Sequence, residues 1–267
     1  MKRSSNASFF YFYAMIKEWL RNIRMNYASE QTYIAQRMLQ EQGSWQSHLN
    51  NSKKFIEEFI IDHPSKSINI LGSGWLLDVP MDRIIEQFDS VVLTDIYHPK
   101  QVVNRYSKYQ NVEFKTADLT YGAVDLTYAV NKRNFNLEEY LTKIKAIKRV
   151  NYDADILVSV NLLSQLSIFI TDYLTNKVTL NNNQIIEIAS AIQQNHLKSL
   201  PQNRSVLITD YEEEFVDEDN KFIGSKPTIF IDIPKNNGTK EWTWKFDSQM
   251  TYREDCKTYL KVVATKI

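Results

Sequence analysis

A Gly-x-Gly turn follows the first strongly apolar run after residue 64. The run Ile68-Asn69-Ile70-Leu71 leads directly into Gly72-Ser73-Gly74. Glycine adopts backbone angles that other residues avoid, and it lets a ligand lie directly against main-chain N–H groups. The turn is therefore a candidate cofactor contact, although a plain tight turn is an equally good explanation of two glycines taken alone.

Two acidic residues follow the next two apolar runs. Asp95 ends the run that begins at Val91, roughly 20 residues after the turn, which is the spacing at which an acid meets ribose hydroxyls. One carboxylate can accept both hydroxyl protons, and Asp118, after the run 112–114, can accept from the exocyclic amine of adenine. Either acid can instead cap a turn. The neighbouring residues are predicted cofactor contacts as well: Ser73, Gly74, Ile96 and Leu119.

Two polar residues follow the apolar runs 155–160 and 205–209. The amide of Asn161 can orient a nucleophile or the amino end of a cofactor, or it can cap a helix predicted over 162–174. Tyr211, preceded by Asp210, can face the mouth of a site at the carboxyl edge of a sheet, or lie in a surface turn. Asn161 and Tyr211 are the predicted catalytic residues, with Asn161 also a cofactor contact.

The elements needed to position these residues divide the chain into two parts. Residues 1–62 are predicted to be helical, and residues 63–267 alternate apolar runs with amphipathic stretches, which is typical of a parallel sheet covered on both faces. Three later strands are predicted to be antiparallel: 228–233, 242–246 and 259–265. The predicted helices of the second part are 81–88, 100–106, 137–150 capped by Asn136, 162–174 and 184–200. The fold class is therefore α/β, with an N-terminal helical extension.

The order of these motifs resembles the class I S-adenosylmethionine-dependent methyltransferase superfamily over residues 64–267. The segments 71–80, 161–166 and 45–49 look more narrowly like a bacterial methyltransferase-like group. The resemblance implies a Rossmann-like, mostly parallel seven-stranded sheet with antiparallel C-terminal strands, and S-adenosylmethionine as the cofactor. It implies an enzyme that transfers a methyl group to a small molecule or a protein side chain, with the methyl group beside the end of the fourth strand.

The chain departs from the superfamily pattern at two positions. Ile70 stands where an acid usually helps to hold the cofactor, and Asp78 or His48 is a candidate replacement. Leu76 stands where a third glycine is usual, and its presence also disfavours nicotinamide dinucleotide binding. These departures motivate the alternative of a non-catalytic binding protein that docks a partner through the aromatic stretch 9–13.

Composition excludes several other classes. Lys plus Arg equals Asp plus Glu at 32 each, so no overall charge attracts nucleic acid or an anionic membrane, and neither partner is expected. No run approaches the roughly 20 apolar residues of a membrane span. Cys256 is the single cysteine, which points to a reducing compartment and a cytoplasmic location. The four histidines are scattered, so no metal site is predicted. Asn161-Leu162-Leu163-Ser164 lacks the Pro-Pro-aromatic sequence of enzymes that methylate base amines.

Overall fold

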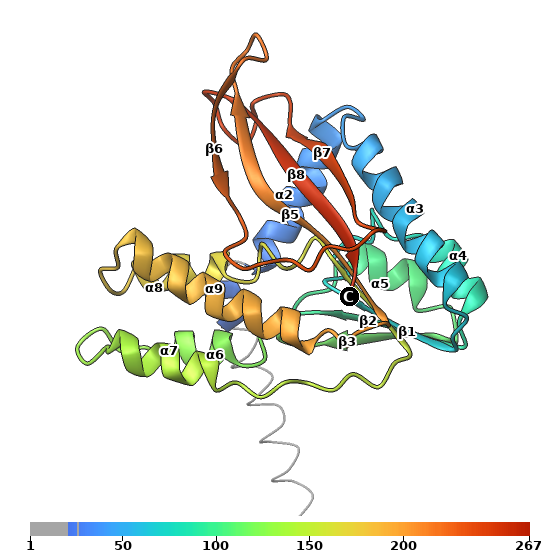
Figure 1. The fold of residues 1–267 in the computed structure, drawn as a ribbon, viewed down its shortest axis with the longest axis horizontal. Helices are drawn as coiled ribbons and strands as arrows, with labels where there is room; N and C mark the ends of the chain where they lie inside the picture. Colours follow the sequence, from blue (N-terminus) through green and yellow to red (C-terminus); the bar gives the residue numbers. More distant parts are fainter. Residues whose placement is uncertain (1–20, 26) are drawn as a thin grey trace, which may run out of the picture.

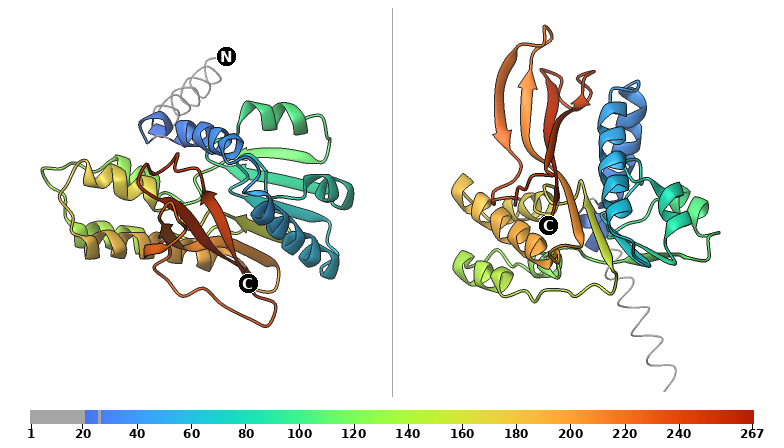
Figure 2. Two further views of the ribbon diagram at one scale, coloured as in Figure 1. Left: turned by 90° about the horizontal axis from the view of Figure 1, so that it is seen from above. Right: turned by 45° about the vertical axis from the view of Figure 1, so that its right-hand side comes forward.

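The computed structural model describes residues 21–25 and 27–267 (Figure 1). The predicted docking stretch 9–13 lies outside these residues. Helices α2 (Tyr27–Gln40) and α3 (Gln46–Asp62) lie before the first strand. Both run beside the C-terminal strands in the views of Figure 2, and the indole N–H of Trp45 donates to the carbonyl of Phe246 at 2.9 Å. The division of the chain at residue 62 stays a proposal.

Eight strands form one sheet. They are β1 (Ser67–Leu71), β2 (Ser90–Asp95), β3 (Val112–Thr116), β4 (Ile156–Val160), β5 (Ser205–Val216), β6 (Phe222–Pro227), β7 (Lys240–Asp247) and β8 (Lys257–Lys266). The order is β3-β2-β1-β4-β5-β8-β7, and β6 pairs with the outer half of β5. The first five strands pair in parallel, whereas β6, β7 and β8 pair antiparallel. The predicted Rossmann-like sheet with an antiparallel end is confirmed. It has eight strands where the resemblance implies seven, and β6 lies just before the predicted strand 228–233.

Helices cover both faces of the parallel half of the sheet. The helices are α4 (Met81–Gln87), α5 (Lys100–Tyr106), α6 (Ala123–Tyr128), α7 (Leu137–Lys145), α8 (Ile168–Thr175) and α9 (Asn182–Ser199). Side chains from α3, α4 and α5 share one buried core with β1, and those from α6 to α9 share a second core on the opposite face. Buried residues fill β4 completely, because it lies centrally and is covered on both sides.

Two predicted helices are wrong in their boundaries. The helix predicted over 162–174 begins only at Ile168 with Ser167 at the cap position, so Asn161 is not its cap; Asn161 itself has a left-handed φ of 46°. The helix predicted over 137–150 ends at Lys145, although its predicted cap Asn136 does accept from the N–H of Glu139 at 3.0 Å. The short helix α6 was not predicted.

The segment 228–233 is not a strand, although its isoleucines alternate. The side chain of Gln193 on α9 takes the backbone hydrogen bonds that a neighbouring strand would make. Its amide donates to the carbonyl of Thr228 at 2.9 Å, and its oxygen accepts from the N–H of Phe230 at 2.8 Å. The isoleucines of this segment still pack on the core. The alternation of apolar residues therefore predicted correctly that they are buried, and predicted incorrectly that the segment pairs with a neighbouring strand.

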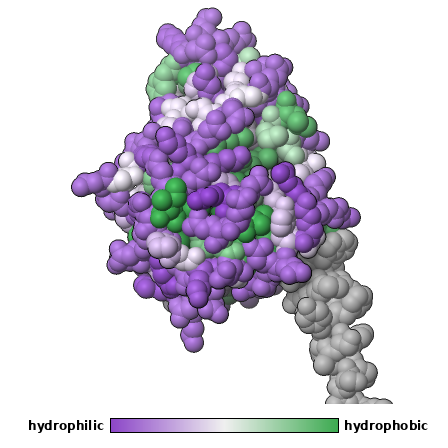
Figure 3. Space-filling model, turned by 90° about the vertical axis from the view of Figure 1, so that its right-hand side faces the viewer, coloured by the Kyte–Doolittle hydropathy of each residue, from purple (hydrophilic) through white to green (hydrophobic). Residues whose placement is uncertain are grey.

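The outer surface carries no continuous apolar face in the view of Figure 3. Hydrophobic residues form small separate patches among hydrophilic ones on that face (Figure 3). Among the described residues, none of the helices is both long enough and apolar enough to cross a membrane.

Candidate active site

A cavity of about 390 Å³ opens where β1, β2 and β4 end, beside the middle of β5. Helices α2 and α3 and strands β7 and β8 supply its other walls. All of the predicted cofactor contacts line this cavity: Gly72, Ser73, Gly74, Asp95, Ile96, Asp118, Leu119 and Asn161. The volume falls within the range of small-molecule sites. The fold therefore gathers residues that are far apart in the sequence around one space.

Glycine is required in the turn after β1. The backbone φ of Gly72 is 77° and that of Gly74 is 39°, both in the region that favours glycine. A Cβ on Gly72 would lie 2.9 Å from the Cβ of Leu162, and one on Gly74 would lie 3.3 Å from Oε1 of Gln31. The β1 turn is thus pressed between the segment after β4 and helix α2, and any larger residue would push these elements apart.

The carboxylate of Asp95 closes the turn from the end of β2. It accepts from the N–H of Gly74 at 2.8 Å and from the N–H of Tyr97 at 3.2 Å. Burial raises the pKa of Asp95, and the N–H donors of Gly74 and Tyr97 partly oppose that shift. The N–H of Ile96 also lowers the pKa of Asp95, and the oxygen lone pairs that these three donors leave open can accept from a ligand. A ribose hydroxyl is a donor of that kind.

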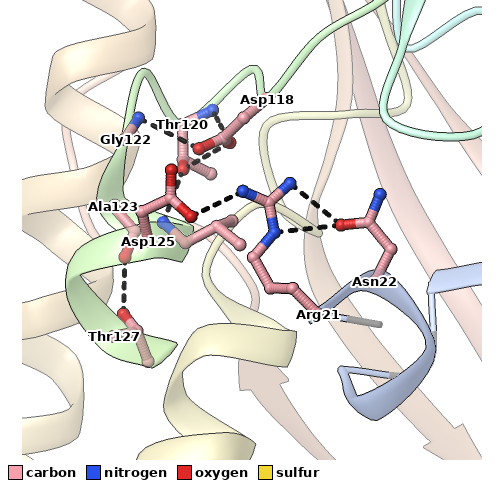
Figure 4. Close-up of polar contacts among 9 residues, drawn as sticks. Arg21, Asn22, Asp118, Thr120, Gly122, Ala123, Asp125 and Thr127 are labelled. Atoms are coloured by element: carbon pink, nitrogen blue, oxygen red, sulfur yellow. Dashed lines mark hydrogen bonds and ion pairs between the residues drawn. The ribbon is translucent and has the colours of Figure 1, made fainter. Parts of the chain in front are cut away.

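Asp118 organises the loop that leads into α6 (Figure 4). Its Oδ1 accepts from the N–H of Thr120 at 2.8 Å and from the Thr120 hydroxyl at 2.6 Å, while Oδ2 accepts from the N–H of Gly122 at 3.0 Å. Both lone pairs of Oδ1 are used, so Oδ2 alone can accept one more donor. Asp118 therefore caps its own turn and also retains one acceptor position at the cavity wall.

An ion pair holds the start of the described chain beside this loop. The guanidinium of Arg21 donates to Asp125 at 2.6 Å and contacts Asn22, as Figure 4 shows. Tyr27, six residues further along, lines the cavity, and its pKa is raised by burial and then by the nearby charge of Asp118. The first turn of α2 is in this way fixed at the Asp118 side of the cavity.

Asn161 connects the end of β4 to the N-terminal helices. Its amide nitrogen lies 2.5 Å from Oδ2 of Asp78 and 3.0 Å from Nε2 of His48. Burial raises the pKa of Asp78, and the hydrogen bond from Asn161 lowers it in part. The Asn161 side chain points to α3, and it does not cap α8, which begins seven residues later at Ile168. Both candidates for replacing the acid absent at Ile70 therefore lie beside Asn161.

His48 is buried and neutral. The indole nitrogen of Trp242 lies 3.1 Å from Nδ1 and donates to it, while Nε2 faces the amide nitrogen of Asn161. The ring stacks on Trp244 with centroids 3.9 Å apart, and burial lowers the pKa of His48 to about 3. An imidazole held in this state does not exchange protons near pH 7.

Tyr211 does not line the cavity, whereas its neighbour Asp210 does. The register of β5 against β8 shifts between Asp210 and Glu212, so Tyr211 occupies a bulge and packs on the α6 to α9 side of the sheet. Its hydroxyl donates weakly to Glu241 at 3.5 Å. A bulge redirects one side chain relative to its neighbours, and here it removes Tyr211 from the site and leaves Asp210 inside.

Several cavity residues carry no sequence motif. Helix α2 contributes Gln31 and Arg37, and the loop after β7 contributes Tyr252. Strand β7 adds Trp244 and Phe246, which alternate on one face of the strand and were predicted only as part of its strand pattern. These residues line the cavity because of which elements meet there, and the spacing of residues in the sequence does not predict that meeting. In the part of the chain that the structure describes, no group of three or more metal-ligating side chains occurs.

Comparison with known proteins finds only distant likenesses. No protein-family model matches the sequence, and no curated protein matches it. Among solved structures, the "DhpI-SAM-HEP complex" is 8% identical over 91% of this chain and 97% of that one, with a TM-score of 0.39. A Burkholderia thailandensis 1,6-didemethyltoxoflavin-N1-methyltransferase with bound S-adenosylhomocysteine is 9% identical over 94% and 89%, with a TM-score of 0.42. The N-methyltransferase NodS from Bradyrhizobium japonicum is 10% identical over 80% and 85%, with a TM-score of 0.33. These likenesses are too distant to transfer an activity to this chain.

Proposed function

We propose that this protein is an S-adenosylmethionine-dependent methyltransferase that acts on a small molecule or a protein side chain. The observation that carries the proposal is the position of the Gly72–Gly74 turn and Asp95 in the sheet. They end β1 and β2, which are adjacent central strands, at the carboxyl edge where α/β folds bind their ligands. The antiparallel strands after β5 distinguish this sheet from the fully parallel sheet of nicotinamide-dependent dehydrogenases.

The residues at the cavity suit such a cofactor. The Gly72 turn lets a ligand approach the main chain, Asp95 has acceptor positions for ribose hydroxyls, and Asp118 keeps one for the adenine amine. Oε1 of Gln31 is buried at the cavity without a hydrogen-bond partner, and a ligand donor would satisfy it. The cofactor would supply a methyl group on a positively charged sulfur, and the chain would supply binding, orientation and exclusion of water.

The two departures from the superfamily pattern bear on this proposal in different ways. Ile70 is completely buried in the core, so its side chain does not reach the site. Leu76 has a φ of 56°, so the backbone keeps the left-handed conformation for which glycine is usual at this position. Asp78, beside Asn161, is an acid of the cavity lining that can take the place of the carboxylate absent at Ile70.

Calorimetric titration with S-adenosylmethionine tests the proposal. The wild type is expected to bind saturably, and Asp95→Ala is expected to weaken binding at least tenfold. Asp89→Ala is the matched control, because Asp89 is an exposed acid outside the cavity and should leave the affinity unchanged. Since Asp95→Ala also removes a turn contact, Asp95→Asn and circular dichroism check that the fold is intact. No saturable binding by the wild type, or equal binding by the folded variants, would refute the proposal. Binding without turnover to S-adenosylhomocysteine in cell extract would leave the alternative of a non-catalytic binding protein.

A further inference from the structure

Asp210 is a buried carboxylate of the cavity that the site described above does not use. It lies near the middle of β5, two residues after Ile208, whose carbonyl accepts from the N–H of Asn161 at 2.8 Å. Its side chain is therefore close to the end of β4, on the side of the cavity away from Asp95. Its residue is 5% exposed and it lines the cavity. A ligand that reaches past Asn161 meets this carboxylate.

Among the described residues, Asp210 forms no ion pair. The Ser164 hydroxyl donates to its Oδ1 at 2.6 Å. Its neighbour Glu213 differs, since Lys226 lies 2.9 Å and Arg253 lies 3.4 Å from the Glu213 carboxylate. Burial raises the pKa of Asp210, as expected for a carboxylate without a counter-ion. A buried carboxylate in this condition is stabilised by a ligand that brings positive charge.

The charge and shape of the surrounding wall suit the same kind of ligand. The described cavity residues include one guanidinium, Arg37, against six carboxylates: Asp78, Asp95, Asp118, Asp172, Asp210 and Glu213. Aromatic rings form the adjoining wall, and the Arg37 guanidinium lies 4.7 Å from the Phe246 centroid and 4.5 Å from that of Tyr252. Aromatic faces attract cations, and these two already hold one at the edge of the cavity.

We propose that the methyl acceptor is an organic cation with a protonated amine, and that Asp210 binds its ammonium group. The inference rests on the proposed function, which it extends to the class of acceptor. Ser164 holds Oδ1 of Asp210 in place, and an ammonium group supplies the counter-charge and up to three donors. The apolar part of the ligand lies against Trp244 and Phe246. Asp172, which also lines the cavity, adds negative charge around the same space.

Binding of matched amines and alcohols tests the proposal. The probes are 2-phenylethylamine against 2-phenylethanol and hexylamine against hexanol, titrated by calorimetry into the wild type, Asp210→Asn and Glu212→Gln. Asn keeps a side-chain oxygen for the Ser164 hydroxyl while removing the charge. Glu212 is the control, because it is an acid on the same strand that does not line the cavity. Each titration is run with and without saturating S-adenosylhomocysteine.

The wild type is expected to bind at least one amine tenfold or more tightly than its alcohol. Asp210→Asn should lose that preference, and Glu212→Gln should keep it. Equal affinities for amine and alcohol in the wild type, or an unchanged preference in Asp210→Asn, would overturn the proposal. If S-adenosylhomocysteine itself does not bind, the proposed function fails, while the titrations without it still decide whether Asp210 selects a cation.

Discussion

Replacing His48 by glutamine should change the pH dependence of stability by an amount that follows from its burial. The side chain is 1% exposed, and its folded pKa of about 3 lies below the unfolded value of 6.5. At a pH between these two pKa values, His48 is protonated in the unfolded chain and neutral in the folded chain. His48 therefore contributes stability that is fully present above pH 6.5 and is lost as the pH falls toward 3. At pH 5 the loss for one such histidine is about 2 kcal/mol.

Glutamine cannot titrate, so this loss should be absent from His48→Gln. Urea unfolding of both proteins at pH 7.5 and pH 5 gives the change in the free energy of unfolding with pH for each. That free energy should fall by about 2 kcal/mol more in the wild type than in the variant. The second buried histidine, His196, whose pKa is lowered to about 4, is present in both proteins and cancels. The acids with raised pKa near the cavity are also present in both proteins, so their contributions cancel apart from any direct interaction with His48. Equal losses in the two proteins would refute the assignment of a neutral, buried His48.

Three further substitutions test other contacts. Gly72→Ala places a Cβ 2.9 Å from that of Leu162 at a φ of 77°, so unfolding in urea should show a loss of about 1–3 kcal/mol, and an unchanged midpoint would contradict the strained turn. Trp242→Phe leaves the buried Nδ1 of His48 without its donor, which should cost about 1–3 kcal/mol at pH 7.5; a smaller loss in His48→Gln/Trp242→Phe than the sum of the single variants would confirm the coupling. Glu41→Gln replaces a buried carboxylate that accepts from the N–H and hydroxyl of Ser248 at 2.9 and 2.6 Å. The free energy of unfolding, measured by heat or urea, should fall by roughly 1.5–3 kcal/mol, and an unchanged value would contradict a contribution of these hydrogen bonds to stability.

The sequence predicted the site residues that lie at or just after the ends of strands. The run 68–71 is buried on both faces, which suits a central strand, and the glycines after it are where the backbone has positive φ. Asp95 is the last residue of β2 and Asp118 comes two residues after β3, so a parallel sheet brings them to the same edge. Each of these inferences needs only the residues next to it in the sequence.

The position of the other site residues depends on contacts between distant segments. Asn161 followed by an apolar stretch is a reasonable helix start, yet its side chain turns to His48 on α3 and Asp78 after β1. A bulge in β5 turns the predicted catalytic residue Tyr211 away from the cavity and leaves Asp210 in its lining, and a bulge arises from strand pairing that the sequence does not display. The wall formed by α2 and β7 likewise exists only because the N-terminal helices pack against the C-terminal strands.

A crystal structure of the protein soaked or grown with S-adenosylhomocysteine tests the central claim most directly. The proposed function predicts the ribose hydroxyls within hydrogen-bond distance of Asp95, the adenine beside Asp118 and Leu119, and the sulfur near Asn161, with the Gly72–Gly74 turn against the ligand. Clear density for the ligand elsewhere on the molecule, or an empty cavity at concentrations that saturate binding in solution, would contradict it.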